Sequence, residues 1–477
     1  MDYDIVIGLE VHSELKTKSK VFCSCKNEFG GEPNTNCCPV CIGLPGALPI
    51  PNKEAVKMCI KAGLAVGCEI NDIAIFERKN YFYPDLAKAY QISQAVRPIC
   101  IGGGVEIEKE NGEKKFIRLN RIHLEEDAGK LIHNSKLGGT QIDYNRGGVP
   151  LIEIVSEADM SSAEEAVAYL AKLKSILQYI EVSDCKMEQG SLRCDVNVSL
   201  KPKGAKELGV RAEMKNLNSF RSVARAIEYE YKRQSRLLDE GEQVVQETRR
   251  WDDARNRSFS MRRKEDAQDY RYFPDPDLLP FKIERSLVEE IRESMPKLRE
   301  EKIADYVKEL GLSEYDAKVL TTDLNLVKYF EKVISFYNSP KFVCNFILTT
   351  LLKKVKESDE EDLCIPVDAK NFANLMKMYE TNEISQATCR ELFDEIWSTN
   401  ADCVALVDER GLKQNNDEGE LKALVEAVIA EFPQSVADYK NGNAKALSFF
   451  VGQLMKRTGG KANAQIASKI IKEILDK

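Results

Sequence analysis

Histidine is scarce in this sequence, and two signatures of common enzyme classes are missing as well. Only His12, His123 and His133 occur among the 477 residues, so Ser-His-Asp or Cys-His catalysis has few places to form. There is no G-x-S-x-G nucleophile elbow and no G-x-x-x-x-G-K-[ST] phosphate-binding loop. These absences argue against an α/β-hydrolase and against a P-loop nucleotide-binding protein.

The sequence also has no long hydrophobic run. Its longest apolar stretches, such as DIVIGLEV and VPLIEIV, are far too short to cross a bilayer. The N-terminal MDYDIVIGLE is acidic and leads straight into a strand pattern, so we expect no signal or transit peptide and a cytoplasmic protein. The net charge of −8 argues against nonspecific coating of nucleic acid, but it leaves room for RNA binding through a local basic face.

Chain length and a change in residue pattern predict several domains. At 477 residues, the chain is too long for one compact core. Residues 1–285 alternate short β-branched runs with turn signals, which is typical of a mixed or antiparallel sheet with hairpins. From there on, apolar residues recur at helical spacing, and a polar break follows residue 407. We therefore expect an α+β fold, with a strand-rich catalytic body over residues 1–285 and an all-α tail of two modules, residues 286–407 and 408–477.

Two helices interrupt the strand-rich body. Ser161 and Glu164 form a capping-box pattern ahead of an apolar face that recurs over residues 170–180. A second helix is expected from about residue 218 to residue 240. The three prolines of YRYFPDPDLLP, residues 270–280, are expected to mark a boundary, because proline continues neither kind of element well.

Cysteine, in contrast, is plentiful, and its distribution predicts a metal site. Five of the fourteen cysteines lie in CSCKNEFGGEPNTNCCPVC, residues 23–41. Four thiolates complete a tetrahedral zinc site and leave no position for water, so the metal would hold the fold. The expected ligands of this zinc knuckle are Cys23, Cys25, Cys38 and Cys41. Cys37 is surplus, although it could replace Cys38. The plain alternative is a group of small buried residues without a metal.

A catalytic zinc is the competing interpretation of the same region. His12-x-Glu14 followed by Cys38-x-x-Cys41 is similar to the H-x-E…P-C-x-x-C arrangement of zinc deaminases. However, the residue before Cys38 is a cysteine instead of proline, and His12 lies in an alternating apolar run typical of a strand. The other pair of cysteines would also have no purpose. The structural site is therefore the preferred interpretation.

Acidic residues recur inside strand-like apolar stretches, where a charge is costly unless it is paired or binds a cation. Glu10 and His12 fall on one face of the first expected strand. The other acidic residues of this kind are Glu125, Glu126, Asp127, Glu153, Glu188, Asp195 and Glu213. As a set they suit Mg²⁺, which prefers oxygen ligands and bridges carboxylates to nucleotide phosphates. Taken singly, each is better explained by a salt bridge or a solvated face.

A segment rich in cations and aromatic rings lies between these acidic stretches. Residues 77–94 contain Lys79, Tyr81, Phe82, Tyr83 and Lys88. Such a mixture is typical of a surface that binds phosphate or an exposed nucleotide base. An ordinary surface loop that packs its rings inward is the alternative.

Several of these stretches together resemble the motifs of one known family. They are GLEVHSEL, CPVCIGLPGALP, FERKNYFYPDLAKAYQISQ, IHLEEDAGK, YNRGGVPLIEIVSE, GSLRCDVNVSL and RYFPDPDLLP. The family is that of the B subunits of the tRNA-dependent amidotransferases. Residues 438–465 are similar to the small C-terminal helical module of the same family, so the resemblance covers essentially the whole chain.

The resemblance implies a function that the residue patterns alone do not show. Members of this family use ATP and Mg²⁺ to phosphorylate the side-chain carboxylate of Glu or Asp misacylated on tRNA(Gln) or tRNA(Asn). Ammonia released from glutamine by an amidase A subunit then displaces the phosphate, and a small C subunit holds the two larger subunits together. Which of the two charged tRNAs this chain would serve stays open.

The resemblance also assigns roles to residues. It implies that His12, Glu10 and Glu125 are catalytic and that they hold Mg²⁺ together with Glu153. Glu188, Asp195 and Glu213 are expected at a second cation or along the ammonia path. The residues expected to contact ATP or the tRNA 3′ end are Lys79, Tyr81, Tyr83 and Lys88. The cysteine cluster matches the zinc knuckle of the family.

The C-terminal module is expected to grip the body of the tRNA. The cations expected to do so are Lys440, Lys445, Lys456, Arg457 and Lys461. The sequence departs from the family pattern at Ala464, where proline is more usual, so details of this contact are less well specified. A solvated helix face is the alternative for any single lysine.

Two other functions stay open at the level of sequence. A zinc deaminase would need Cys38 and Glu14 but no ATP. A non-catalytic tRNA-binding scaffold with a zinc knuckle would bind RNA without hydrolysing ATP. The acidic residues within apolar strands favour the ATP-dependent enzyme over the scaffold.

Overall fold

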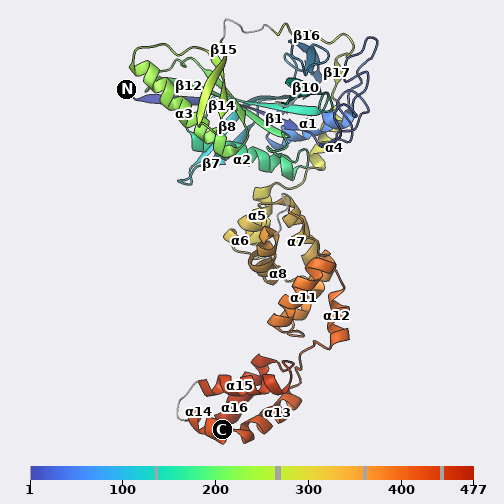
Figure 1. The fold of residues 1–477 in the computed structure, drawn as a ribbon, viewed down its shortest axis with the longest axis vertical. Helices are drawn as coiled ribbons and strands as arrows, with labels where there is room; N and C mark the ends of the chain where they lie inside the picture. The colour runs from blue at the N-terminus through green and yellow to red at the C-terminus, as the bar shows by residue number, and fades with distance from the viewer. Residues whose placement is uncertain (1, 135–137, 264–269, 358–362, 441–444, 477) are drawn as a thin grey trace. The chain divides into compact units, whose positions relative to one another are not determined.

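The computed structural model describes residues 2–134, 138–263, 270–357, 363–440 and 445–476. The chain separates into two compact units, Met1–Arg299 and Glu300–Lys477 (Figure 1). The first is built around a mixed sheet and the second is helical, so the expected α+β class is confirmed. The finer division at residues 285 and 407 stays a prediction.

One large mixed sheet forms the centre of the first unit. Its strands are β1 (Tyr3–Glu14), β2 (Glu69–Ile70), β6 (Cys100–Ile101), β7 (Gly104–Glu108), β8 (Lys114–Glu126), β11 (Pro150–Ser156), β12 (Leu192–Pro202), β13 (Ala212–Leu217), β14 (Glu247–Asp252) and β15 (Arg257–Arg263). The order across the sheet is β15-β14-β13-β12-β1-β11-β8-β6-β2, and β7 also pairs with β8. Only β13 and β14 run parallel; the other neighbours are antiparallel.

Short strands complete the first unit. They are β3 (Ile73–Ala74), β4 (Glu77–Asn80), β5 (Tyr90–Ser93), β9 (Lys130–Asn134), β10 (Gly139–Asp143), β16 (Phe273–Pro274) and β17 (Phe281–Lys282). The proline-rich segment 270–280 does more than mark a boundary, because β16 pairs with β4 and places Pro274 opposite Glu77. Proline fits there since β16 is the edge strand of its small sheet.

Helices cover one face of the large sheet and leave the other face for polar residues. These helices are α1 (Lys53–Ala65), α2 (Ala163–Tyr179), α3 (Phe220–Asp239) and α4 (Arg285–Glu293), and Figure 1 shows α2 and α3 beside the strands. Their apolar sides share one core with Ile7, Leu9 and Val11 of β1. Because side chains alternate along a strand, Glu10 and His12 point to the opposite face.

The second unit is helical within its described residues. Its elements are α5 (Arg299–Lys308), α6 (Glu314–Leu320), α7 (Leu324–Phe336), α8 (Pro340–Phe346), the π-helical turn Ile347–Leu351, α9 (Leu352–Glu357), α10 (Ala369–Glu380), α11 (Gln386–Thr399), α12 (Cys403–Arg410), α13 (Glu418–Glu431), α14 (Pro433–Lys440), α15 (Lys445–Arg457) and α16 (Ala464–Leu475). The last four pack around their own core, which includes Leu421, Phe450 and Ile471. Within the described ranges, none of the helices has the length and apolar character needed to cross a membrane.

Candidate active site

Four neighbouring strands bring the predicted acidic residues to one region of the open sheet face. His12 of β1 lies opposite Glu153 of β11, and Glu153 lies opposite His123 of β8. On the other side of β1, Glu10 lies opposite Asp195 of β12. Strand pairing therefore gathers side chains that are far apart in the sequence.

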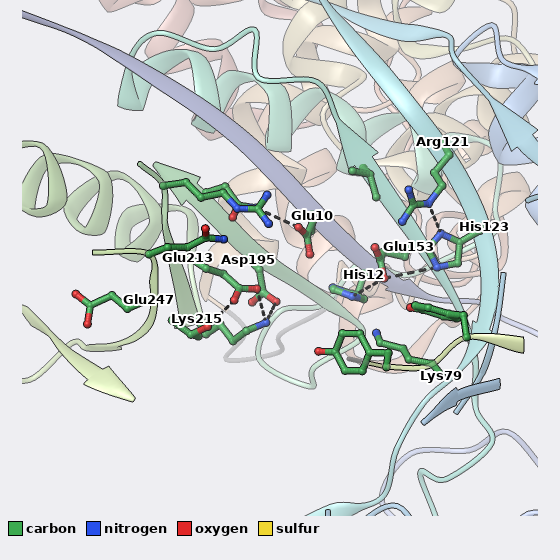
Figure 2. Close-up of a pocket in the computed structure, with 17 residues that line it drawn as sticks. Glu10, His12, Lys79, Arg121, His123, Glu153, Asp195, Glu213, Lys215 and Glu247 are labelled. Carbon is green, nitrogen blue, oxygen red and sulfur yellow. Dashed lines mark hydrogen bonds and ion pairs between the residues drawn. The ribbon is translucent and has the colours of Figure 1, made fainter. Parts of the chain in front are cut away.

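These residues line a pocket of about 400 Å³ (Figure 2). The predicted site residues in its walls are Glu10, His12, Lys79, Glu153, Asp195 and Glu213. The other lining residues are Arg121, His123, Val155, Asn197, Arg211, Lys215, Gln246, Glu247, Thr248, Tyr270 and Tyr272. A concave site of this size, with several charged groups that converge on it, suits a small polar ligand.

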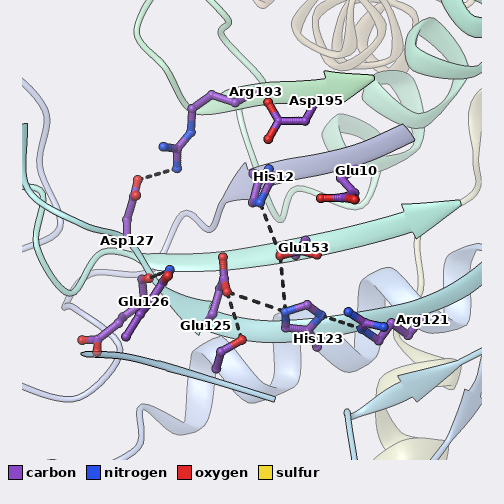
Figure 3. Close-up of polar contacts among 12 residues, drawn as sticks. Glu10, His12, Arg121, His123, Glu125, Glu126, Asp127, Glu153, Arg193 and Asp195 are labelled. Atoms are coloured by element: carbon purple, nitrogen blue, oxygen red, sulfur yellow. Dashed lines mark hydrogen bonds and ion pairs between the residues drawn. The ribbon is translucent and has the colours of Figure 1, made fainter. Parts of the chain in front are cut away.

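His12, Glu125 and Glu153 form the first polar group (Figure 3). One potential ligand atom from each residue lies within 4.8 Å of the others. His12 Nε2 is 3.4 Å from the Glu153 carboxylate, and the Ser93 hydroxyl donates a 3.0 Å hydrogen bond to Glu125. Glu125 is 1% exposed and Glu153 is 7% exposed. Two carboxylates buried side by side need positive charge or hydrogen-bond donors nearby, which Lys79 and the two histidines supply in part.

His123 supports this group through a defined tautomer. Arg121 Nε donates to His123 Nδ1 over 3.3 Å, so Nδ1 is the acceptor and the proton is assigned to Nε2. His123 Nε2 lies 3.6 Å from both Glu125 and Glu153. Both nitrogens of His123 are therefore engaged, and His12 is the histidine of this group that can offer a nitrogen to a metal.

Burial and neighbouring charge act in opposite directions on the first group. Burial raises the pKa of Glu153, but the two histidines and Lys79 outweigh it and hold that pKa well below its usual value. The pKa of Glu125 is also lowered, because His123 and Lys79 outweigh its burial. For His12, burial lowers the pKa, but the adjacent carboxylates raise it above the ordinary value. The carboxylates are thus anionic at neutral pH, and a metal at His12 would have to compete with a proton that the carboxylates help to hold.

Glu10, Asp195 and Glu213 form the second polar group, again with ligand atoms within 4.8 Å (Figure 2). The Lys215 ammonium forms a close ion pair with Asp195 and lies 2.9 Å from Glu213. The Asn197 amide donates a 3.1 Å hydrogen bond to Glu10. Lys215 therefore neutralises part of this group from within the chain.

The charges of the second group shift its pKa values in two ways. Burial raises the pKa of Glu10, and the surrounding carboxylates of Glu153, Glu213 and Asp195 raise it further. Burial lowers the pKa of Lys215, but its two carboxylate partners outweigh this effect and raise the pKa. The lysine therefore stays charged at neutral pH, while Glu10 holds its proton more tightly than an exposed glutamate does.

The donor sets of the two groups differ in how readily they fit a divalent cation. The first group offers an imidazole nitrogen and two carboxylates, which suits a hard or borderline divalent ion. In the second group, a cation would have to compete with Lys215 for Asp195 and Glu213. The first group is therefore the better fit for Mg²⁺, and the second becomes available only if Lys215 moves.

Lys79, Tyr270 and Tyr272 form another wall of the pocket, and Tyr81 lies behind it. Lys79 Nζ lies 5.1 Å from the Tyr270 ring centre, and Tyr81 packs edge-on against Tyr270 with 5.9 Å between ring centres. Burial lowers the pKa of Lys79, but Glu125 and Glu153 outweigh it and raise the pKa. A stable positive charge thus faces the carboxylates of the first group and can orient an anionic ligand.

Lys88 and Tyr83 lie outside the pocket walls. The Lys88 ammonium forms a buried ion pair with Glu126 and lies 5.3 Å from the Tyr90 ring centre. Tyr83 is 57% exposed. The structure thus gives Lys88 a partner within the fold and leaves Tyr83 at the surface, and their contacts with ATP or the tRNA 3′ end stay predictions.

The remaining acidic residues of the predicted set are separate from both groups. Glu188 is exposed in the turn that precedes β12, so the apolar sequence around it belongs to a turn rather than to a strand. Asp127 accepts a 2.6 Å hydrogen bond from Arg193, and Glu126 is paired with Lys88. For Asp127 and Glu126 the salt-bridge alternative holds, and nothing in this placement supports a metal role for Glu188.

The cysteine cluster forms a compact group. The Sγ atoms of Cys23, Cys25, Cys38 and Cys41 lie within 4.8 Å of one another. Cys37 lies outside the group, and its thiol donates to the Asn34 carbonyl over 3.3 Å. The Cys41 sulfur accepts a 3.0 Å hydrogen bond from the Cys38 backbone N–H and lies 3.8 Å from the Lys20 ammonium. Four sulfurs so arranged can bind a metal, and tetrahedral zinc fits them best.

The four thiols differ in pKa: the hydrogen bond to Cys41 raises the pKa of Cys23 and burial raises that of Cys25, whereas the pKa of Cys41 is lowered. A hydrogen bond from Cys23 is the largest effect on Cys41, and with the Cys38 backbone and Lys20 it lowers the pKa of Cys41 to about 5, against the effect of burial. A thiolate is the form that binds metal. His12 belongs to a different group, with Glu125 and Glu153, so the histidine and the cysteines do not form the single centre of a zinc deaminase.

The cations predicted to bind the tRNA body lie on α14, on α15 and in the segment between α15 and α16 of the second unit. Lys440, Lys456, Arg457 and Lys461 are exposed. Arg457 pairs with Glu431 over 2.8 Å. The backbone of Lys445 begins α15, but its side chain lies outside the described residues. The role of these cations in binding the tRNA body stays a prediction.

Sequence reasoning missed several residues that shape the pocket. Lys215 and Arg121 were not singled out, and Tyr270 and Tyr272 were assigned only to a boundary. One signal was available: Arg121, His123 and Glu125 alternate along β8 in the same way as Glu10 and His12 along β1. The others owe their position to pairing between distant segments.

Comparison with protein families places this site in a known class. Residues 5–289 match the family described as the GatB/GatE catalytic domain, and residues 328–475 match the family described as the GatB domain. The first match includes every residue that lines the pocket. Fold and site thus define a protein with a catalytic domain of the GatB/GatE class.

Similarity to full-length proteins identifies the family within this class. The B subunit of the aspartyl/glutamyl-tRNA(Asn/Gln) amidotransferase of Lachnoclostridium phytofermentans is 51% identical over 475 residues, covering 100% of this chain and 99% of the relative. The proteins of the same name from Thermoanaerobacter pseudethanolicus and Persephonella marina are 52% and 50% identical, with 100% of each chain covered. The chain therefore belongs to the family of aspartyl/glutamyl-tRNA(Asn/Gln) amidotransferase B subunits.

Proposed function

We propose that this chain activates the side-chain carboxylate of Glu on tRNA(Gln), of Asp on tRNA(Asn), or of both, with ATP, for amidation by ammonia. The observation that carries this proposal is the group of His12, Glu125 and Glu153: His12 and Glu153 line the pocket together with Lys79, and Glu125 is buried beside them. The three side chains of the group can bind a divalent cation, and Lys79 supplies a fixed positive charge for phosphate. The family of the chain supports the same reaction.

The reaction needs activation because a carboxylate is a poor acyl donor. A side-chain carboxylate oxygen attacks the γ-phosphorus of ATP, the bond to the bridging oxygen breaks, and ADP leaves. The resulting acyl phosphate carries a good leaving group. Ammonia then attacks the carbonyl carbon, inorganic phosphate leaves, and a proton is lost from nitrogen to give the amide.

The residues of the pocket have separate tasks in this reaction. His12, Glu125 and Glu153 would hold Mg²⁺, which neutralises phosphate charge when bound. Lys79 would orient the anionic reactants through its positive charge. Arg121 positions His123, which in turn holds Glu125 and Glu153. Lys215 would keep Asp195 and Glu213 in place until a second cation displaces it or a phosphate binds it.

The partners and compartment follow from the same proposal. The relatives are named as B subunits, so we propose an amidase A subunit as the source of ammonia and a small C subunit in one complex. Zinc at the four cysteines would hold the fold. We place the reaction in the cytoplasm, where a cluster of thiols stays reduced and binds metal.

We also propose three domains that divide the work. Residues 1–285 would carry the catalytic site, residues 286–407 would form a helical domain, and residues 408–477 would bind the tRNA body. The exposed cations Lys440, Lys456 and Lys461 support the last assignment.

ADP formation by the chain with its A and C partners tests this function. We expect ADP only when Glu-tRNA(Gln) or Asp-tRNA(Asn) is present, and a loss of more than about 100-fold in Glu125→Gln, because a neutral amide replaces a buried anionic ligand. Glu106→Gln makes the same chemical change at an exposed position of β7 and should keep full activity. Charged tRNA that binds without promoting ADP formation would favour the scaffold instead.

A further inference from the structure

The site face of the large sheet continues past the pocket onto the hairpin of β14 and β15. In the parallel register of β13 and β14, Glu213 lies opposite Thr248 and Lys215 lies opposite Arg250. Thr248 lines the pocket, and its hydroxyl donates a 2.7 Å hydrogen bond to Glu213. Because side chains alternate along a strand, Arg250 is the next residue of β14 on this face.

The hairpin presents guanidinium groups around an aromatic ring. Phe259 of β15 lies opposite Arg250 and is 36% exposed. The Arg257 guanidinium lies 4.6 Å from the centre of the Phe259 ring, and that of Arg255 lies 5.9 Å from it. Arg250, Arg255 and Arg257 are all exposed. We call these four residues the hairpin surface.

The opposite face of the hairpin is already covered. Trp251 is 1% exposed and packs against Tyr229 of α3, with 5.8 Å between ring centres. Arg249 donates a 2.7 Å hydrogen bond to Ser258 and lies near Glu230 of α3. The hairpin surface therefore points away from the core, on the same side of the sheet as the pocket.

The charge of the hairpin surface is only partly balanced by the residues that the structure describes. Arg255 pairs with Asp252 over 3.4 Å, and this pair is largely exposed. Arg250 and Arg257 have no carboxylate within ion-pair distance among the described residues. The protein as a whole has a net charge of −8, so this concentration of arginine is a local feature. The described residues thus leave Arg250 and Arg257 accessible to a complementary anionic group.

We propose that the hairpin surface binds the RNA of the charged tRNA whose aminoacyl end enters the pocket. The inference rests on the proposed function and adds an RNA contact on the catalytic unit to the one expected on the last helices. Arginines supply bidentate partners for phosphates, and a ring flanked by guanidiniums provides a platform for an unpaired base. Because the surface is contiguous with the pocket, RNA held there would guide its end to the reacting groups.

Two simpler explanations make different predictions. Arginine on an edge strand can serve only to prevent pairing with other sheets, in which case RNA affinity would not depend on it. The same surface could instead contact an acidic protein. The combination of a ring with two guanidiniums, next to a pocket for phosphate chemistry, favours RNA.

Binding of a fluorescently labelled tRNA(Gln) transcript, followed by anisotropy over a series of KCl concentrations, tests the inference on the full-length chain. In Arg250→Gln/Arg257→Gln we expect roughly tenfold weaker binding near 0.1 M KCl. The slope of log Kd against log [KCl] should fall by about 1.5, since roughly two phosphate contacts are lost. Phe259→Leu should weaken binding about fivefold with little change in slope, because it removes stacking and no charge.

The control removes the same number of charges from the covered side. Lys232→Gln/Arg236→Gln changes two exposed cations of α3 and should leave Kd within twofold of the unmodified chain. Thermal melting shows whether each variant is folded. A Kd and a salt slope for Arg250→Gln/Arg257→Gln equal to those of this control would overturn the inference, and increased aggregation with unchanged Kd would assign the arginines to edge protection.

The inference and the proposed function fail in different ways. If the unmodified complex binds tRNA but forms no ADP with charged tRNA, the proposed function fails and the anisotropy result still decides the role of the hairpin surface. If ADP formation is as proposed but the hairpin variants bind tRNA normally, only the inference fails. Mn²⁺ binding measured by electron paramagnetic resonance should be the same in the hairpin variants and the unmodified chain.

Discussion

At the scale of single residues, the site depends on charges placed where they are costly. Glu125 and Glu153 could be predicted because a carboxylate inside an apolar strand needs a partner or a cation. Lys215 could not, because a lysine in a half-exposed strand is ordinary, and its partner Asp195 lies 20 residues earlier on the neighbouring strand. A local sequence pattern shows that a charged residue lies in an apolar strand. Which residue pairs with it depends on the register between strands.

The ion pair of Asp127 with Arg193 gives a prediction about pH at this scale. Asp127 is 5% exposed, and it lies 2.6 Å from Arg193 and 3.5 Å from Arg146. Burial raises the pKa of Asp127, but the two arginines outweigh it and lower the pKa below that of the unfolded chain. The anionic form therefore stabilises the fold above the unfolded pKa of about 4, and this stability is lost as pH falls through the folded pKa.

Urea denaturation of Asp127→Asn at pH 7 and at pH 3 checks this expectation. The substitution should lower the free energy of unfolding by about 2 kcal/mol at pH 7, because it removes a charged hydrogen-bond partner of Arg193, which is itself partly exposed. The difference from the unmodified protein should shrink at pH 3. Asp159→Asn, which breaks the more exposed pair with Arg118, should cost less than about 1 kcal/mol. A cost at Asp127 that does not change with pH would contradict the account.

At the scale of elements, helical periodicity was predictable and the exact cap was not. Leu170, Leu173 and Leu177 line the buried side of α2, each 1% exposed, as predicted. The capping box is displaced by one residue: Ser162 accepts a 3.1 Å hydrogen bond from the Glu165 N–H, not Ser161 from Glu164. The sequence SSAEE satisfies the S-x-x-E pattern in both positions, so the pattern alone could not choose between them.

The observed cap predicts which serine matters for stability. Ser162→Ala should lower the free energy of unfolding by about 1 kcal/mol, because it leaves a backbone N–H at the start of α2 without its partner. Ser161→Ala keeps the backbone hydrogen bond to Glu165 and should cost less. Chemical denaturation of both variants at neutral pH decides this, and equal costs would mean that the cap is shared.

The cysteine cluster is an element in its own right, since its loop has little regular structure to hold it. The expected ligands could be read from their spacing, but the exclusion of Cys37 depended on the loop geometry that turns its thiol to Asn34. Cys41→Ser should remove one equivalent of zinc per chain and lower the melting temperature by several degrees. Cys37→Ser should keep both zinc content and melting temperature. Metal analysis by mass spectrometry together with thermal melting measures the two effects, and zinc loss in Cys37→Ser would contradict the assigned ligand set.

At the scale of the whole molecule, the class of fold followed from the change in periodicity along the chain. The strand-rich half and the helical half appear as two compact units, Met1–Arg299 and Glu300–Lys477. The predicted boundary at residue 285 stays a prediction, but α4 beyond it packs into the core of the first unit through Val288 and Ile291. Such packing joins residues far apart in sequence, and composition does not report it.

The division of labour between the units gives a prediction about tRNA affinity. Lys456→Gln/Lys461→Gln should weaken binding of tRNA(Gln) about fivefold near 0.1 M KCl, because two exposed cations of the second unit are lost. ADP formation at saturating charged tRNA should not change, since these residues lie outside the catalytic unit. Lys422→Gln/Lys469→Gln removes two other exposed cations of this unit and is the control. An equal loss of tRNA affinity in the two double variants would show that affinity depends on the net charge of the unit and not on one surface.

The most direct test of the central claim follows oxygen from the amino acid to phosphate. Glu-tRNA(Gln) labelled with ¹⁸O in the side-chain carboxylate is incubated with ATP, Mg²⁺, ammonium and the chain with its A and C partners, and the released inorganic phosphate is analysed by mass spectrometry. Activation as an acyl phosphate predicts one ¹⁸O atom in each phosphate, transferred when ammonia displaces it. Formation of Gln-tRNA(Gln) with unlabelled phosphate would contradict the account.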